Sequence, residues 1–279
     1  MLPVFYVYKV STSTISSLIR ASQYSDGSPN SNNREWHMAD GAAVAVAGMH
    51  GDIQRINIIS HNLANALTPA YKRMWPVSTG FDALMAPDGR PGPHESLAAL
   101  ETKSDFRPAP SRHTGNPLDL AIEGDAFFEL NEATGATTYT RQGSLTLDAG
   151  GRLVAPGGAA VAGMGGEIRL ESGQVSIDRA GRILDNKGAV AGQIKLVRFN
   201  DTGKLLPAGL GRYMQGSAIP EPANDSTVIR QRHVEASNVV PADEMVRLIE
   251  TMRHFESGQK VIQWYDDMLE QALSRLGQY

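Results

Sequence analysis

The chain has 279 residues and a mass near 30.0 kDa, a length that accommodates one or two domains. Its formal net charge of −4 gives no reason to expect a general affinity for nucleic acid or anionic lipid. The absence of cysteine excludes disulfides, thiol catalysis and cysteine-ligated zinc or iron–sulfur sites. The longest apolar run, residues 42–49, is far shorter than the roughly 20 residues that span a bilayer, so we expect no direct membrane insertion.

Residues 1–37 differ in composition from the rest of the chain. Residues 11–33 contain 13 Ser, Thr or Asn and show no periodicity, a composition that cannot bury enough apolar surface to fold. The apolar residues 2–8 lack both a preceding positive charge and a following small-residue cleavage site, so we expect no cleaved secretory signal. A helical pattern begins just after Met38. We therefore interpret residues 1–37 as a disordered extension or a mis-assigned start, with Met38 as the natural start.

A helix is predicted near the N-terminus, within residues 38–72. Asp40 is a suitable N-cap, and Pro69 disfavours helix in the residue before it, so the expected helix runs from Asp40 to Leu67 and is about 42 Å long. Apolar residues recur at alternating spacings of three and four, which is the pattern of a coiled-coil seam. These N-terminal seam residues are Val46, Met49, Ile53, Ile56, Leu63 and Leu67.

The C-terminal segment, residues 234–279, repeats this pattern. Pro241 suits a first helical turn, and Asp243 and Glu244 complement the helix dipole there. The predicted helix ends at Leu276 and is about 54 Å long. The two helices either pack on each other beneath a globular domain or form a terminal coiled coil that serves an assembly, and the pattern leaves both interpretations open. The C-terminal seam residues are Met245, Leu248, Met252, Phe255, Ile262, Leu269, Leu273 and Leu276.

Between the helices the sequence is typical of β structure. Residues 73–113 contain six prolines and little periodicity, which indicates an extended connector. Residues 114–233 contain short apolar or alternating runs separated by turn residues, which predicts a β-rich domain. Those runs are 118–122, 126–130, 138–140, 144–147 and 193–199. The expected fold class is α+β, with coiled-coil-like terminal helices flanking a central all-β domain.

A weak internal repeat lies within the β-rich region. Residues 147–154 match residues 177–184 at an offset of 30. Each copy places an Asp before a Gly, which predicts a tight turn between two strands.

No recognised catalytic motif for nucleotide binding, zinc proteolysis or serine hydrolysis occurs. Glu123 and Asp125 flank Gly124 between two apolar runs, where a hairpin turn explains them better than a catalytic carboxylate pair. His50 and His61 lie 11 residues apart on the predicted N-terminal helix, about 16 Å, which is too far to share a metal ion. We therefore expect no catalytic, cofactor-binding or metal site, and no enzyme.

Three segments of the chain carry recognisable signatures. Residues 60–73 have the sequence SHNLANALTPAYKR, residues 114–128 precede a YTRQG segment, and residues 235–239 have the sequence EASNV. In this order they resemble the signatures of the flagellar basal-body rod protein family, the rod and hook axial proteins, and they cover residues 38–279. The matched positions are Asn62, Leu63, Ala64, Asn65, Thr68, Tyr71, Ser237, Asn238, Val239, Glu244, Met245, Arg253, Phe255 and Glu256.

The resemblance implies a structural role. It implies that the terminal helices build the inner tube of the rod, that the β domain packs outside them, and that stacked subunits transmit torque for motility. The implied partners are other rod subunits, proximal and distal, together with the surrounding ring proteins and the flagellar export apparatus, with no nucleic acid. The implied location is the periplasm-spanning rod of the basal body, reached without a cleaved signal peptide.

Within the family, the proximal-rod members are most similar, with the distal-rod members next. The middle of the chain is compact, and no proline-glycine motif precedes the C-terminal signature. The alternative from another class of protein is a β-rich binding module or adhesin whose helices form a stalk.

Two glycine positions depart from simple expectations. Ala70 stands where the family often has Gly, and a positive φ there would cost about 1 kcal/mol for Ala. Gly258 lies inside the predicted C-terminal helix, where Gly costs about 1 kcal/mol relative to Ala.

Overall fold

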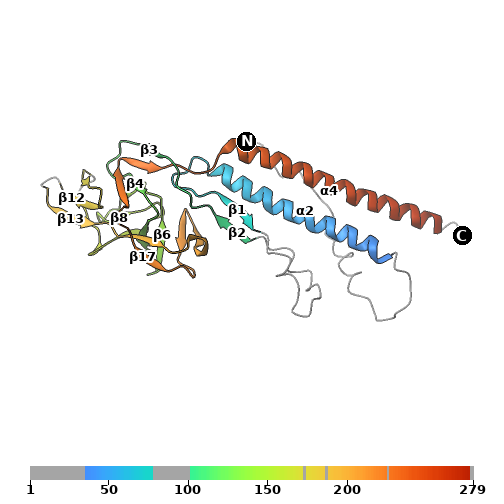
Figure 1. Ribbon diagram of the computed structural model, residues 1–279, viewed down its shortest axis with the longest axis horizontal. Coiled ribbons are helices and arrows are strands. Elements are labelled where there is room, and N and C mark those ends of the chain that lie inside the picture. The colour runs from blue at the N-terminus through green and yellow to red at the C-terminus, as the bar shows by residue number, and fades with distance from the viewer. Residues whose placement is uncertain (1–34, 78–100, 172–173, 186–187, 225, 277–279) are drawn as a thin grey trace. The chain divides into compact units, whose positions relative to one another are not determined.

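A computed structural model describes residues 35–77, 101–171, 174–185, 188–224 and 226–276. Two helices, α2 (Glu35–Ala64) and α4 (Pro241–Leu276), lie at the two ends of this part of the chain, with short strands between them (Figure 1). The chain divides into two compact units, residues 1–44 and 45–279, and the side-chain contacts described below lie within the second unit. The arrangement confirms the α+β class with a central β region.

The strands are short and pair antiparallel throughout the described residues. The largest sheet has the order β15-β16-β6-β5-β9-β8-β7, with β10 beside β9 and with β14 between β5 and β17. Strands β11, β12 and β13 form a second sheet, and β1 with β2, β4 with β18, and β3 with β19 form pairs. The strands are β1 (Met74–Val77), β2 (Glu101–Ser104), β3 (Ser111–His113), β4 (Leu120–Glu123), β5 (Phe127–Asn131), β6 (Thr137–Thr140), β7 (Thr146–Leu147), β8 (Leu153–Val154), β9 (Ala160–Gly163), β10 (Gly166–Glu167), β11 (Ser176–Ile177), β12 (Arg182–Leu184), β13 (Val190–Gln193), β14 (Leu196–Phe199), β15 (Leu206–Gly209), β16 (Arg212–Met214), β17 (Pro220–Pro222), β18 (Val228–Gln231) and β19 (His233–Glu235).

The β region has an apolar cluster on each face of β5. Phe127 and Phe128 are adjacent, so their side chains point to opposite faces of the strand. Phe128 packs in the larger cluster, which also contains Leu120 and Leu130. Phe127 packs in an aromatic cluster with Phe106, Tyr139, Phe199 and Tyr213, whose rings meet edge to face. Each face of β5 therefore contributes a phenylalanine to one of the two apolar clusters.

The internal repeat forms the same turn twice. Asp148 Oδ1 accepts hydrogen bonds from the backbone N–H groups of Gly150 and Arg152, at 2.9 and 2.8 Å, and Asp148 Oδ2 accepts one from Arg152 Nε at 2.8 Å. Asp178 makes the equivalent contacts with Ala180 and Arg182. The backbone and side-chain donors of Arg152 hold the pKa of Asp148 below its ordinary value. The predicted Asp–Gly turns are confirmed.

The predicted bounds of the N-terminal helix are wrong at both ends. Helix α2 begins at Glu35, so Asp40 lies inside it and is not its N-cap. The helix ends at Ala64 because residues 65–68 form tight turns, in which the N–H of Thr68 donates to the carbonyl of Asn65 at 3.0 Å. The hydroxyl of Thr68 also donates to the side-chain oxygen of Asn65, at 3.2 Å, and such local side-chain bonds compete with helix. Residues 1–34, most of the expected extension, lie outside the described residues.

Two further sequence-based expectations, the hairpin at Gly124 and the extended connector, differ from the structure. Glu123, Gly124 and Asp125 join β4 to β5, but these strands do not pair with each other: β4 pairs with β18, and β5 pairs with β6, β9 and β14. The hairpin prediction is therefore wrong, and Glu123 instead forms a 2.7 Å ion pair with Arg230 on β18. Of the expected connector, residues 73–113, the described part forms β1, β2 and β3, while residues 78–100 lie outside the described residues.

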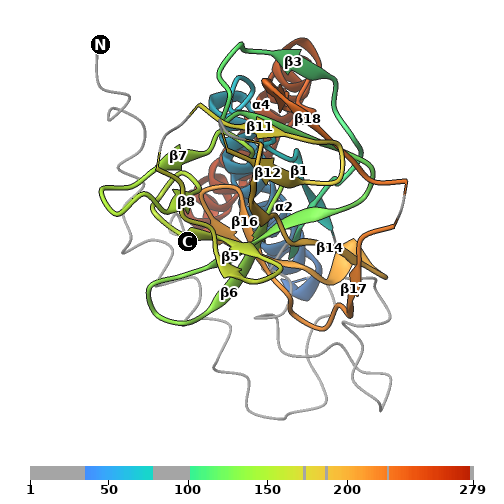
Figure 2. The same cartoon turned by 90° about the vertical axis from the view of Figure 1, so that its left-hand side faces the viewer.

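Helices α2 and α4 pack on each other in antiparallel directions. Asn62 contacts Glu244, whereas Asp52, nearer the start of α2, contacts His254 further along α4. A Cβ on Gly258 would lie 2.9 Å from Met49 Cγ, so glycine allows the side chain of Met49 to approach α4 closely. Figure 2 shows the two helices from their end. Of the two interpretations left open by the sequence, packing within one chain is therefore present.

Candidate functional site

The predicted seam contains both half-buried and exposed side chains. Met49, Ile56 and Leu63 on α2, and Leu248, Phe255 and Ile262 on α4, are half-buried. The remaining described side chains of the seam are exposed, and Leu67, in the turn after α2, is the most exposed of them at 92%. Leu273 and Leu276 belong to α4, but their side chains lie outside what the structure describes. The exposed members are Val46, Ile53, Leu67, Met245, Met252 and Leu269.

Three exposed apolar residues of α4 form one patch, which we name the α4 stripe. Met245, Ile249 and Met252 are spaced by four and three residues, so they lie on one helical face. About half of each side chain is exposed. The sequence-based seam omitted Ile249 because it lies one step off the heptad positions, although the i, i+4, i+7 pattern contains it.

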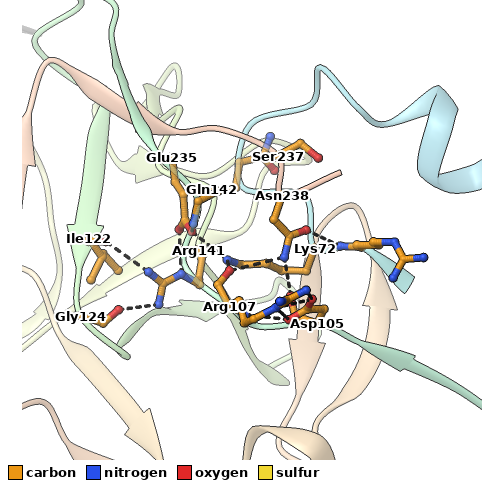
Figure 3. A network of polar contacts seen from close by, with 12 residues as sticks. Lys72, Asp105, Arg107, Ile122, Gly124, Arg141, Gln142, Glu235, Ser237 and Asn238 are labelled. Carbon is orange, nitrogen blue, oxygen red and sulfur yellow. Dashed lines mark hydrogen bonds and ion pairs between the residues drawn. The ribbon is translucent and has the colours of Figure 1, made fainter. Parts of the chain in front are cut away.

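A second set of residues forms a polar network at the end of the helix pair, which we name the polar joint. Its centre is Glu235 on β19 (Figure 3). The Glu235 carboxylate accepts hydrogen bonds from Lys72 Nζ at 2.7 Å, from Arg141 Nε at 2.7 Å and from the backbone N–H of Ala109 at 3.0 Å. All three charged side chains are nearly inaccessible, with at most 3% exposed. One buried carboxylate thus holds two buried cations.

The remaining donors of the two cations bind backbone carbonyls. Arg141 donates to the carbonyls of Ile122, Gly124 and Ala126, at 3.2, 2.9 and 2.9 Å, and so fixes the connection between β4 and β5 (Figure 3). Lys72 Nζ donates to the carbonyl of Arg107 at 2.8 Å. Buried charges are stable only when paired and hydrogen-bonded in this way.

The environment shifts the pKa values of this network. Burial opposes the ionisation of Glu235, but the charges of Arg141 and Lys72 outweigh burial and hold the pKa of Glu235 below its ordinary value. Burial lowers the pKa of Lys72, against the opposing attraction of Glu235. The ionised carboxylate is therefore the group that anchors the network.

Asn62, near the end of α2, connects the two helices to β1. Its side chain is fully buried. Its Nδ2 donates to the carbonyl of Met74 at 2.8 Å and to Glu244 on α4 at 3.1 Å, while its Oδ1 accepts from the N–H of Met74 at 2.8 Å. Glu244 also accepts from Arg73 Nε at 2.6 Å. Asn62 thus binds the strand that follows it and the helix from the opposite end of the chain.

Tyr71 and Asn238 complete the polar joint. The hydroxyl of Tyr71 donates to Asn62 Oδ1 at 3.2 Å. Burial raises the pKa of Tyr71 to about 12, with smaller contributions from Tyr213 and Glu244. Asn238 Oδ1 accepts from the N–H of Arg73 at 2.6 Å, and its Nδ2 donates to the carbonyl of Asp105 at 2.7 Å. The segment after α2 is therefore bound at several successive residues.

The signature residues fall into three places. Asn62, Tyr71, Asn238 and Glu244 converge in the polar joint, although they come from opposite ends of the chain. Leu63 and Ala64 close α2, Asn65 and Thr68 form the turn after it, and Ser237 and Val239 follow β19. The structure does not bring the rest into the joint, and these lie along α4: Met245, Arg253, Phe255 and Glu256.

Four charged members of the polar joint were not among the predicted site residues. They are Lys72, Arg73, Arg141 and Glu235. Each of them lies inside one of the signature segments, so a search for charged residues within those segments could have found them. Their pairing spans up to 171 residues of sequence and has no local pattern.

Ala70 has a φ of 55°, in the left-handed region, so the strain expected at this family glycine position is present. Its side chain is buried, and its N–H donates to the carbonyl of Glu235 at 2.8 Å. This bond attaches the backbone after α2 directly to β19.

Among the described residues, no three His, Asp or Glu side chains lie close enough to hold a metal ion. His50 and His61 both lie on α2, with exposed side chains. Within the same residues, neither helix is apolar enough over a sufficient length to cross a bilayer.

Two family descriptions match parts of this chain. "Flagellar hook protein FlgE/F/G D1 domain" matches residues 121–185, in the β region. "Flagellar basal body rod FlgEFG protein C-terminal" matches residues 230–275, which contain β19, Asn238 and most of α4. The two matches cover both sides of the Glu235–Arg141 ion pair.

Several whole proteins are also similar over most of their length. The chain is 32% identical to the flagellar basal-body rod protein FlgG of Buchnera aphidicola, over 84% of this chain and 98% of that protein. It is 32% identical to the flagellar basal-body rod protein FlgF of Caulobacter vibrioides, over 80% of this chain and 92% of that protein. It is 28% identical to FlgG of Bacillus subtilis, over 82% and 96%. The chain therefore belongs to the flagellar basal-body rod protein family.

Proposed function

We propose that this protein is a structural subunit of the flagellar basal-body rod and that it assembles with neighbouring rod subunits through the exposed apolar surface of its terminal helices. The observation that carries this proposal is the α4 stripe. It stays exposed although α4 already contacts α2 through Glu244, His254 and Gly258. A helix pair that buries one apolar face and exposes another has a surface available for further helices.

The geometry favours an open assembly. The α4 stripe and the exposed residues of α2, Val46 and Ile53, belong to different helices and have different sequences. Contacts between unlike surfaces of identical subunits repeat head to tail and build a helical filament, unless the rotation closes a ring. Rod subunits of this family are thus expected to stack along and around the rod.

The polar joint supports a mechanical role. The segment after α2 binds β19 and α4 through Ala70, Lys72 and Arg73, so the backbone between helix and β domain is fixed at successive positions. Buried ion pairs are costly to break one partner at a time. We infer that torque applied to the helices passes to the β domain through this joint without free rotation.

Membership of the family supports a proposal for the partners and the location. We propose that other rod subunits, proximal and distal, are the direct neighbours, that ring proteins surround the β domain, and that the flagellar export apparatus delivers the chain to the periplasm without a cleaved signal. We also propose that Met38 is the natural start and that residues 38–72, 114–233 and 234–279 act as N-terminal rod helix, β domain and C-terminal rod helix. The names FlgF and FlgG among the relatives support both rod positions equally.

The test is Ile249→Asp, which places a carboxylate in the centre of the α4 stripe. In a strain that lacks this protein, the variant should be exported but not incorporated, and swimming in soft agar should be lost. Val190→Asp is the matched control, because Val190 is an equally exposed apolar residue on the β domain. Normal swimming of the Ile249→Asp strain would show that the α4 stripe is not the assembly surface.

A further inference from the structure

The α4 stripe contains methionine at two of its three positions. The exposed fractions of Met245 and Met252 are 52% and 48%. Met49 and Met74, by contrast, are half-buried, and Met49 packs against Gly258 within the helix pair. The side chains of Met245 and Met252 are therefore more exposed than those of Met49, on α2, and Met74, on β1.

An exposed thioether can be oxidised by peroxide. The sulfur attacks one peroxide oxygen, the O–O bond breaks, a sulfur–oxygen bond forms, and the peroxide is reduced by two electrons to water. The resulting sulfoxide is polar and strongly dipolar, so an apolar contact surface that contains methionine is weakened by this reaction. Reduction by methionine sulfoxide reductases reverses it.

We propose that Met245 and Met252 are an oxidation site that controls assembly: their conversion to sulfoxide by peroxide prevents incorporation of the subunit. This proposal rests on the proposed function, because it requires that the α4 stripe is an assembly surface. The seven-residue spacing places both sulfur atoms on one face of α4, so both sulfoxides would enter the same interface.

The intrachain packing makes the effect selective. Leu248 and Phe255, the half-buried members of the α4 seam, contain no sulfur and cannot form sulfoxides, whereas the residues of the α4 stripe are exposed. Oxidation therefore changes the surface presented to a neighbour and leaves the helix pair and the β core intact. The subunit should remain folded but lose its capacity to assemble.

The first experiment maps the reaction. Purified full-length protein is treated with hydrogen peroxide, and sulfoxide at each methionine is measured by peptide mass spectrometry over time. Met245 and Met252 should oxidise several-fold faster than Met49 and Met74. Equal or slower oxidation of Met245 and Met252 would overturn the proposal.

The second experiment measures the consequence in a strain lacking this protein. Met245→Gln with Met252→Gln introduces amide polarity in place of the sulfoxide and should abolish swimming without peroxide. Met245→Leu with Met252→Leu keeps the surface apolar and cannot be oxidised, so this strain should form new rods under sublethal peroxide that stops wild-type assembly. Met164→Gln, at an exposed methionine on the β domain, is the control and should change nothing.

Comparison with Ile249→Asp separates this proposal from the proposed function. If Ile249→Asp swims, the assembly surface itself is wrong. If Ile249→Asp fails but the double glutamine variant swims normally, or if the double leucine variant is as sensitive to peroxide as the wild type, the assembly surface stands and the oxidation proposal is overturned.

Discussion

Replacing Glu235 by glutamine is the sharpest test of the polar joint. The change keeps the size of the side chain but removes the charge that Lys72 and Arg141 share, both at 2.7 Å. The neutral amide offers one acceptor to two buried cations and directs its own NH₂ group at one of them. Breaking a buried ion pair from one side costs about 3–5 kcal/mol, so we expect a loss of that size in the free energy of unfolding.

Glu123→Gln is the matched control for this experiment. The Glu123–Arg230 ion pair has the same 2.7 Å distance, but about half of each side chain is exposed. Exposed pairs contribute about 0–1 kcal/mol, so this variant should unfold almost as the wild type does. The ion pairs that the two variants remove therefore have the same contact distance and differ in burial.

Urea unfolding monitored by near-ultraviolet circular dichroism is the appropriate assay, since Tyr139 and Tyr213 lie in the aromatic cluster of the β domain. Both variants should keep the wild-type dependence of unfolding free energy on urea concentration. A loss below about 1 kcal/mol for Glu235→Gln, equal to that of Glu123→Gln, would refute the argument that burial makes this network strong.

Two further outcomes are expected. Because the pKa of Glu235 is lowered in the folded protein, its stabilising contribution is complete above the ordinary carboxyl value of 4.5 and is lost as the pH falls through the lower folded value. The difference in unfolding free energy between wild type and Glu235→Gln should thus be smaller at pH 3 than at pH 7, and an unchanged difference in urea titrations would contradict this assignment. Gly143→Ala should destabilise the β domain by more than about 3 kcal/mol, because the new Cβ would lie 1.7 Å from the carbonyl oxygen of Leu120; a melting temperature within a few degrees of the wild type would show that the backbone there yields easily.

Local sequence patterns determined the elements of this protein and its family. The heptad spacing predicted a helix at each end, and Pro241 marked the start of α4 correctly. Short apolar or alternating runs predicted β4, β5, β6 and β14 near their observed positions. The Asp148 and Asp178 turns followed from their own side-chain bonds to neighbouring N–H groups. These features depend on contacts between residues a few positions apart, which a sequence displays directly.

The tertiary structure decided where those elements meet. A heptad pattern marks apolar positions but does not say which of them a partner covers, so only the packing of α4 on α2 left Met245 and Met252 exposed and Leu248 half-buried. The polar joint brings Lys72 and Arg141 to Glu235 across separations of 163 and 94 residues. Such pairing depends on the folding of the whole β domain, because no local sequence pattern specifies which buried charged side chains will pair with one another. The same dependence explains the failed hairpin prediction at Gly124, where the strands on either side of the turn found partners in other parts of the chain.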